Sequence, residues 1–300
     1  MKNQYFGDIN DYRKYGLLRI LSAGGKLPTA ICWMLTESDG RTDGKHIAYL
    51  KKSDEYRKFD PELFDKLHEC VHLRGDRNVE LAERNQLIPG AVYYSGMLTD
   101  NVTQRREYFE GLKAIAKECE LVFFDQDNGM EVASVPYGSK DSSKYLYWRE
   151  LDEIYKEGHS VLVYQHFPRK DHDKFKGDLF REACKELQVK NAIMFITSNV
   201  LFMLIPQEKH QSYFHQCANL AEQLWENEIK SAIMELDKKL IFETVSGEKM
   251  TEEQLDTVVN ILFNWWKKDY ETRQSTEVEG SNITSNSNAD RDMEQYRGKV

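Results

Sequence analysis

The clearest chemical signal in the sequence is an acid-rich segment directly after an apolar strand pattern. Residues 121–132 read LVFFDQDNGMEV, so the pattern ends in Asp125, Asp127, Asn128 and Glu131 around a turn-forming glycine. In open α/β sheets, ligands bind at the carboxyl ends of strands. Strand alternation points Asp125 and Asp127 to one side, where two carboxylates could share a cation or a proton. An Asx-rich turn is the structural alternative, but the crowded like charge favours a functional site.

A second polar cluster follows another strand pattern. Residues 36–46 read TESDGRTDGKH, and glycines at a strand end let the backbone approach a ligand. The segment is neither a dinucleotide fingerprint nor a P-loop, and a solvated loop explains it equally well. If it binds a cofactor, the predicted cofactor-binding residues are Asp39, Gly40, Asp43, Gly44, Lys45 and His46.

Three basic side chains complete the predicted catalytic set. Lys144 begins a predicted helix, 143–156, where its charge opposes the helix dipole unless an anion is bound. His166 and Arg169 follow the predicted strand 160–164 and could act as a general base and a phosphate clamp. With the four polar residues of the acid-rich segment they form the expected active site.

The opening segment, residues 7–18, reads GDINDYRKYGLL. Asp8, Asp11 and Lys14 lie three residues apart at a predicted helix start, and Asp8 can serve as the N-cap. Spacing alone favours a capped surface helix with an Asp–Lys pair over a functional role.

These residues must be positioned by an α/β sheet, because short apolar runs alternate with charged segments of helical period. Runs such as LVFF suit central strands covered on both faces. The predicted strands are 30–35, 91–98, 121–124, 160–164, 192–196 and 200–205, and the predicted helices are 12–21, 61–71, 103–117, 143–156, 174–187 and 212–239. Only residues 197–199 separate the last two strands, which predicts an antiparallel hairpin at a sheet edge. We therefore expect a Rossmann-like, doubly wound, mostly parallel sheet.

Composition limits the class of protein. The chain has 300 residues, is 40% hydrophobic and carries a formal charge of −9, which excludes a nonspecific, DNA-coating protein. Five scattered cysteines form no C-x-x-C pair and indicate a reducing cytoplasm. The first residues carry no apolar signal segment, and no apolar run reaches the roughly 20 residues that cross a membrane. We expect a cytoplasmic protein with no membrane segment.

We divide the chain into an α/β domain (1–246), an amphipathic helix (247–271) and a disordered tail (272–300). In the helix, apolar residues recur at helical spacing from Leu255 to Trp266. Such a stripe most often packs on its own domain. The alternative is that the C-terminal helices bind a second copy or a partner protein.

Five motifs together resemble a widespread family of uncharacterised prokaryotic proteins. They lie within residues 5–206 and read GDINDYRKYGLL (7–18), DGKHIAYL (43–50), LVFFDQDNGMEV (121–132), SSKY (142–145) and YQHFPR (164–169). Their combination is specific to relatives and implies little about chemistry.

The layout also resembles class I S-adenosylmethionine-dependent methyltransferases, in which an edge hairpin comes last in the sheet. More distantly it is similar to the 23S rRNA adenine-N6 methyltransferases and the three-Cys-motif partner proteins. In those families an Asp-Pro-Pro-Tyr or Asp-Pro-Phe-Gly motif after a strand holds the target base, and residues 125–129 occupy the matching place. This chain departs from them, because it has no aromatic residue in that motif and no Gly-x-Gly loop after its first strand.

The resemblance implies an enzyme that uses S-adenosylmethionine on a nucleic acid or nucleotide. A rival hypothesis is a nuclease or phosphoesterase, with Asp125 and Asp127 on Mg²⁺ and Lys45 or Lys144 on the phosphate. The acid-rich segment also faintly resembles the first motif of haloacid-dehalogenase phosphatases, but no later acidic pair follows. A third hypothesis is a non-catalytic module that binds a nucleotide or a partner.

Overall fold

The computed structural model describes residues 2–37, 46–75, 77–169 and 171–236. The chain divides into two units, Met1–Glu235 and Leu236–Val300, and the description below concerns the first. The predicted C-terminal helix and tail lie outside the described residues. Within the described part, no helix is long and apolar enough to cross a membrane.

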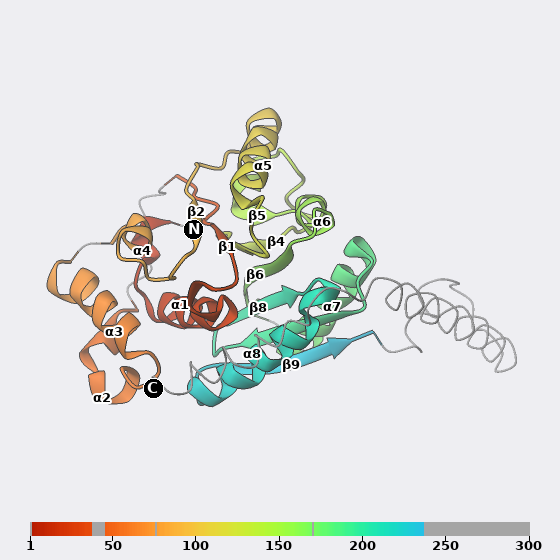
Figure 1. The fold of residues 1–300 in the computed structure, drawn as a ribbon. Helices are drawn as coiled ribbons and strands as arrows, with labels where there is room; N and C mark the ends of the chain where they lie inside the picture. Colours follow the sequence, from red (N-terminus) through yellow and green to blue (C-terminus); the bar gives the residue numbers. More distant parts are fainter. Residues whose placement is uncertain (1, 38–45, 76, 170, 237–300) are drawn as a thin grey trace, which may run out of the picture. The chain divides into compact units, whose positions relative to one another are not determined.

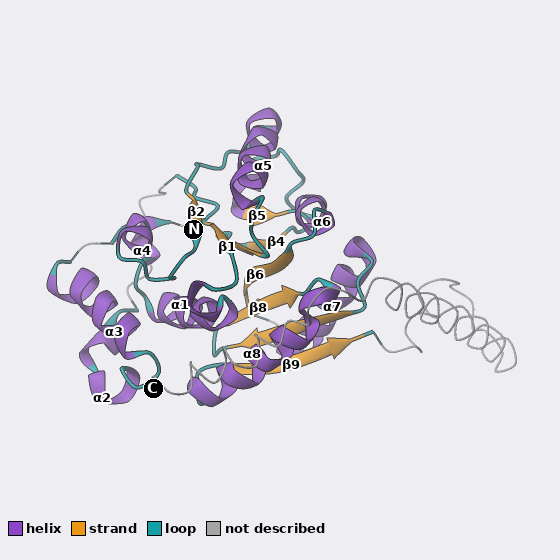
Figure 2. Ribbon diagram, viewed as in Figure 1, coloured by secondary structure: helices purple, strands orange, loops and turns teal. Residues whose placement is uncertain are grey.

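A seven-stranded mixed sheet forms the centre of the first unit, with strand order β2-β1-β3-β6-β8-β7-β9 (Figure 2). Four neighbouring strands, β2, β1, β3 and β6, are parallel, and β8 and β9 run antiparallel to their neighbours. The strands are β1 (Thr29–Cys32), β2 (Val92–Tyr94), β3 (Leu121–Phe124), β6 (Ser160–His166), β7 (Asn191–Ile196), β8 (Val200–Ile205) and β9 (Lys230–Glu235). A separate two-stranded sheet pairs β4 (Gly129–Met130) with β5 (Tyr145–Leu146).

Helices cover both faces of the sheet, as a doubly wound fold requires (Figure 1). On one face α8 packs on β7 and β9 and carries α1; on the other, α5 packs on β1 and β2, α6 on β6 and α7 on β7. The helices are α1 (Ile9–Leu21), α2 (Ser53–Tyr56), α3 (Pro61–Leu67), α4 (Glu80–Arg84), α5 (Val102–Ala116), α6 (Trp148–Lys156), α7 (His172–Leu187) and α8 (Gln211–Leu224). Every residue of β1, β3 and β8 is buried, which explains their continuous apolar sequences.

The predicted Rossmann-like α/β architecture with a parallel core is confirmed. The antiparallel hairpin of β7 and β8 is also confirmed, but its predicted place at the edge is wrong. The edge strand is β9, which lies within the predicted helix 212–239. The helix stops at Leu224 because Trp225 leaves helical geometry and Asn227 takes a positive φ of 63°.

Two further predictions need correction. The predicted strand 91–98 is paired only over Val92–Tyr94, with one isolated bridge at Met97. The predicted helix 143–156 begins at Trp148, because residues 142–146 form the 3-10 turn η5 (Ser142–Lys144) and strand β5. The acid-rich segment needs this short strand as its partner, and β4 is paired with it.

Helix α1 is the largest departure from the prediction. Asp8 caps it as expected, accepting hydrogen bonds from the backbone of Asn10 and Asp11. The helix is not on the surface, however: residues 11–21 are all buried. Gly16 lets Trp225 of the opposite chain segment pack against the helix, since a Cβ there would lie 1.9 Å from the indole ring. Its charged residues are therefore buried together with its apolar ones.

Candidate functional site

The candidate site lies where the order of the parallel strands reverses. β1 lies between β2 and β3, so the chain continues to one side after β1 and to the other side after β3. The crevice outside the carboxyl ends of two such strands is where open α/β sheets bind ligands. Residues 33–36 follow β1 and residues 125–128 follow β3, and the backbone N–H of Asp125 donates to the carbonyl of Cys32 at 3.0 Å. The acid-rich segment therefore flanks this position.

A buried lysine from α1 holds the first acid of the segment. Lys14 Nζ lies 2.7 Å from Asp125 Oδ2 and 2.6 Å from Asp11 Oδ1, and all three side chains are at most 3% exposed. Asp11 in turn accepts hydrogen bonds from the Gly7 backbone and the Tyr15 hydroxyl. Three aromatic rings lie 5.1–5.8 Å from the ammonium: Tyr15, Trp33 and Tyr164. The result is a charged cluster inside an aromatic enclosure.

Burial and charge act in opposite directions on this pair. Burial raises the pKa of Asp125, and the Lys14 ammonium lowers it. Burial disfavours the Lys14 charge, but the Asp11 and Asp125 carboxylates together raise its pKa above the usual value. The ammonium therefore stays charged, and it stabilises the ionised form of Asp125 in surroundings that otherwise oppose it.

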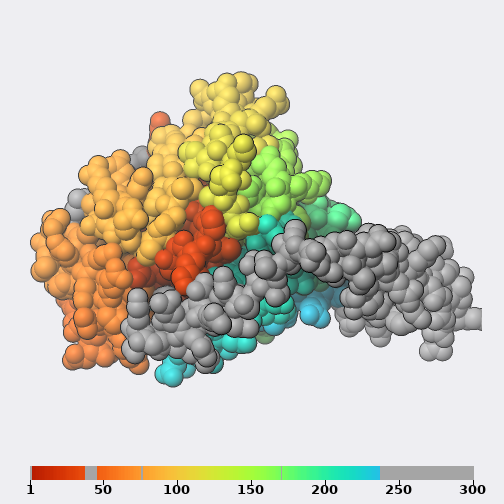
Figure 3. Space-filling view, in the orientation of Figure 1, coloured from red at the N-terminus to blue at the C-terminus, as the bar shows by residue number. Residues whose placement is uncertain are grey.

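The second acid of the segment has a separate partner. Asp127 Oδ2 lies 2.9 Å from Lys2 Nζ, and both side chains are nearly buried. Asp8 is also buried here, and burial together with the nearby Asp11 carboxylate raises the pKa of Asp8 to about 7. Figure 3 shows the N-terminal segment, in red, lying between the orange segment of α2–α4 and the yellow segment of α5. This N-terminal segment supplies both lysines.

Asn128 and Glu131 contact the backbone of the following elements. The Asn128 N–H donates to the Lys144 carbonyl at 2.8 Å, and Glu131 Oε1 accepts from the Trp148 N–H at 2.8 Å. A carboxylate at the first residue of α6 favours the positive end of the helix dipole. Both residues thus connect the acid-rich segment to β5 and α6.

Gly129 permits a close approach that no other residue could make. Its φ is +108°, and a Cβ would lie 2.3 Å from Gln165 Oε1. That oxygen accepts a hydrogen bond from the Met130 N–H at 2.8 Å, which joins the segment to β6. The sequence shows the glycine but not its partner.

His166 and Arg169 lie at and beyond the end of β6. The His166 ring is 5.0 Å from the Tyr164 ring. Desolvation, and then the charge of Lys14, lower the pKa of His166, while Asp127 opposes that shift. His166 therefore lies within the electrostatic reach of the Lys14 cluster. Arg169 is exposed in the segment before α7.

The structure places Lys144 away from the role expected of it. It ends the turn η5 and pairs with Asp141 Oδ1 at 2.7 Å, so it does not begin a helix that lacks a counter-charge. The prediction failed because β5 intervenes between Lys144 and α6.

Most of the predicted cofactor loop lies outside the described residues: Asp39, Gly40, Asp43, Gly44 and Lys45. His46 is described, and its side chain is exposed. Its carbonyl accepts a hydrogen bond from the Ile9 N–H at 3.0 Å, next to the start of α1. The end of this loop therefore meets the N-terminal segment.

Three buried polar atoms at the candidate site have no hydrogen-bond partner: Trp33 Nε1, Thr36 Oγ1 and Gln126 Oε1. Trp33 is fully buried, and Gln126 is 1% exposed. Each such atom costs about 1–3 kcal/mol when it is left without a partner. Sequence reasoning missed these residues, because a tryptophan and a glutamine beside strands read as ordinary core and turn residues. Their position after β1 and β3 points to a ligand that supplies the missing bonds.

No group of three or more metal-binding side chains lies together in the described ranges. Asp125 and Asp127, the predicted metal ligands, each contact a different lysine. The donors of the site are therefore a charged cluster and unpartnered neutral groups.

The fold and the site define an α/β protein with a Rossmann-like mixed sheet and a polar site at its reversal point. The sequence matches no protein-family model and no curated protein. Among solved structures it is similar to protein LPL1258 from Legionella pneumophila, of the family described as DUF519. The two share 12% identity with a TM-score of 0.40, over 78% of this chain and 98% of that one. A likeness of this size says nothing about the chemistry of the site.

Proposed function

We propose that the chain is a methyltransferase-like enzyme that uses S-adenosylmethionine and acts on a nucleic acid or nucleotide. The observation that carries the proposal is the buried Lys14–Asp125 pair at the reversal point, beside polar atoms that lack partners. Enzymes tolerate such costly arrangements where a ligand completes them.

The topology supports this class. The resemblance noted in the sequence depends on a hairpin that comes after the parallel strands. In the sheet, β8 lies between β6 and β7 and runs antiparallel to both. That placement agrees with a methyltransferase-like sheet, to which β9 adds one further edge strand.

The donor set fits the proposed cofactor. Trp33 Nε1 is a hydrogen-bond donor, Gln126 Oε1 is an acceptor, and Thr36 Oγ1 can act as either. S-adenosylmethionine carries amino, carboxylate, hydroxyl and adenine groups that can pair with all three. These residues would hold the cofactor, and when bound it supplies the methyl group.

The residues of the chain have distinct tasks in this proposal. Asp125 accepts a hydrogen bond from the amino group to be methylated, since a carboxylate has room for about four hydrogen bonds. Lys14 orients Asp125 and keeps it ionised. His166 has a lowered pKa, so it is neutral near pH 7 and can accept the proton that the amine releases. The aromatic rings of Trp33 and Tyr164 exclude water.

The metal-dependent nuclease receives less support. A divalent cation would have to displace an ammonium from each of Asp125 and Asp127. Binding of Mg²⁺ therefore requires both ion pairs to break, whereas a neutral amine does not.

Transfer of a radiolabelled methyl group from S-adenosylmethionine to total cellular RNA, DNA or nucleotides tests the proposal. We expect transfer by the full chain and a loss of about 100-fold in Asp125→Asn, as for removal of a charge-stabilising contact. Asp54→Asn, an exposed acid on α2, is the control and should retain activity. Absence of both cofactor binding and transfer would reject the proposal, and Mg²⁺-dependent cleavage lost in Asp125→Asn would favour the nuclease. Binding without transfer would favour the non-catalytic module.

A further inference from the structure

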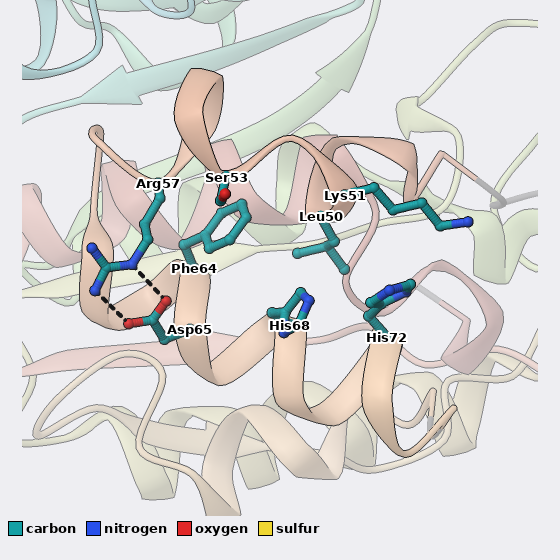
Figure 4. Close-up of a pocket in the computed structure, with 8 residues that line it drawn as sticks. All are labelled: Leu50, Lys51, Ser53, Arg57, Phe64, Asp65, His68 and His72. Atoms are coloured by element: carbon teal, nitrogen blue, oxygen red, sulfur yellow. Dashed lines mark hydrogen bonds and ion pairs between the residues drawn. The ribbon is translucent and has the colours of Figure 1, made fainter.

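A separate groove opens on the helical segment between β1 and β2. It has a volume of about 420 Å³ and lies between α3 with its π-helical extension η4 (His68–Leu73) and the segment of η3 (Ala48–Lys51) and α2 (Figure 4). Its floor is apolar, since Leu50 and Phe64 line it and are at most 2% exposed. Such a floor beneath polar walls is typical of ligand sites.

The walls of the groove carry positive charge and hydrogen-bond donors. Arg57 holds Asp65, the acidic residue of the lining, through two hydrogen bonds of 2.8 Å. Lys51 is exposed, and no ion pair of its side chain is found within the described residues. His72 and the Ser53 hydroxyl also line the groove. The one acid is thus neutralised and a lysine remains, so the groove complements an anion.

The groove also contains a row of rings along one helix face. The Phe64 and His68 rings are nearly parallel, at 15°, with centroids 6.2 Å apart. The His72 ring follows at 4.9 Å from His68. Figure 4 shows both histidine rings side by side on the helix that lines the groove. Aromatic faces of this kind stack on nucleic-acid bases without regard to sequence.

The groove is connected to the candidate site through the start of α1. The ring of Tyr12 packs edge-on against Phe64 at 5.9 Å, and its hydroxyl donates to the Tyr56 carbonyl at 2.9 Å. Tyr12 lies two residues before Lys14 in the same helix. A chain-like substrate that reaches Asp125 can therefore be held by this segment as well.

We infer that the groove binds a nucleotide of a single-stranded nucleic acid that flanks the one being modified. Its base stacks on His68 over the apolar floor, and its phosphate pairs with Lys51 and hydrogen-bonds with His72. The inference rests on the proposed function for its substrate class. It adds that the substrate is a polynucleotide rather than a free nucleotide.

Fluorescence anisotropy of short labelled single-stranded RNA and DNA, with the full chain and no methyl donor, tests the inference. Lys51→Ala should weaken binding roughly 3- to 10-fold and reduce the salt dependence by about one phosphate contact. Lys52→Ala is the matched control, because Lys52 pairs with Glu55 and does not line the groove. It should bind as the unaltered chain does.

Phe64 is buried, so its substitution could unfold the segment, and crosslinking provides a second readout. Oligonucleotides with photoreactive bases should crosslink to the peptide that contains His68 and His72. Equal binding by the Lys51 and Lys52 variants, or crosslinks only elsewhere, would overturn the inference. So would tight binding of Zn²⁺ alone that is lost in His72→Ala, since the imidazoles would then serve a metal.

The same assays separate this inference from the proposed function. Lys51-dependent binding without any methyl transfer would keep the groove and reject the methyltransferase. Methyl transfer to a polynucleotide that does not depend on Lys51 would keep the enzyme and reject the groove.

Discussion

Two buried ion pairs in this molecule have similar composition and different surroundings. In one, Arg105 Nε lies 2.5 Å from Glu150 Oε1, and its other nitrogens donate to Glu150 Oε2 and to the carbonyls of Ser142 and Tyr145. Glu150 also accepts from the Tyr147 N–H. All of these partners lie on elements next to α5, so the pair fastens α6 and β5 to that helix.

The Lys14–Asp125 pair differs in what surrounds it. Several acids crowd one lysine, and neighbouring polar atoms of Trp33 and Gln126 have no partner. Buried polar networks stabilise a fold when every member is satisfied. The comparison teaches that the Arg105 pair is complete within the fold, whereas the Lys14 pair is completed by something that binds.

The largest expected effect concerns the complete pair. Glu150→Ala leaves the Arg105 guanidinium buried without its counter-charge, so the free energy of unfolding should fall by about 3–5 kcal/mol. Because arginine keeps its proton, this loss should not fade between pH 8 and pH 5. Denaturant unfolding measures it, with Glu153→Ala, an exposed acid paired with Lys113, as a control within about 0.5 kcal/mol. An equally small loss in both variants would contradict the account.

The next effect concerns the incomplete pair. Lys14→Met removes the ammonium next to Asp11 and Asp125, and we expect a loss of about 2–4 kcal/mol at pH 8. Burial already raises the pKa of Asp125. Without Lys14 this acid binds a proton more readily in the folded state, so the loss should shrink as the pH falls. A loss that is constant from pH 8 to pH 5 would remove the distinction between the two pairs.

A smaller effect is expected at the junction of the acid-rich segment and β6. Gly129→Ala places a Cβ against Gln165 and strains a positive φ, so it should cost about 2–3 kcal/mol. Gly158→Ala has a similar φ of +98° with nothing within 4 Å, and it should cost only about 1 kcal/mol. The difference, measured by thermal unfolding, isolates the contact. Equal costs would show that Gln165 yields freely.

The smallest effect is a gain in stability. The pKa of Asp8 is about 7 in the folded state and lies well above its unfolded value. Its charged form is therefore penalised, and stability is lost as the pH rises from about 4 through 7. Asp8→Asn retains an N-cap without the charge and should gain about 1 kcal/mol at pH 8. Denaturant midpoints at pH 8 and pH 5 measure the gain, and a gain of equal size at pH 5 would contradict this origin.

The sequence predicted the parts of the fold that local patterns determine. The buried runs of β3, β6, β7 and β8 carry enough apolar residues to be recognised, and Asp8 shows its capping role by type and position. Strand β9 could not be recognised, because its polar edge sequence KSAIME directly continues a helical pattern. Its pairing with β7 depends on contacts distant in the sequence.

The candidate site was predictable only in part. Asp125 and His166 were found because acids and bases at strand ends are unusual. The roles of Lys2 and Lys14 were not, since their partners lie more than a hundred residues away. An Asp–Lys spacing of three reads as a surface pair, and only the tertiary fold buries it.

Calorimetric titration of S-adenosylmethionine into the full chain and two threonine variants tests the central claim most directly. Thr36 has a buried hydroxyl without a partner after β1, whereas Thr103 is exposed on α5. The account predicts binding to the unaltered chain, about tenfold weaker binding to Thr36→Val and no change in Thr103→Val. No binding to the unaltered chain, or equal binding to all three proteins, would contradict the claim that the ends of β1 and β3 form the ligand site.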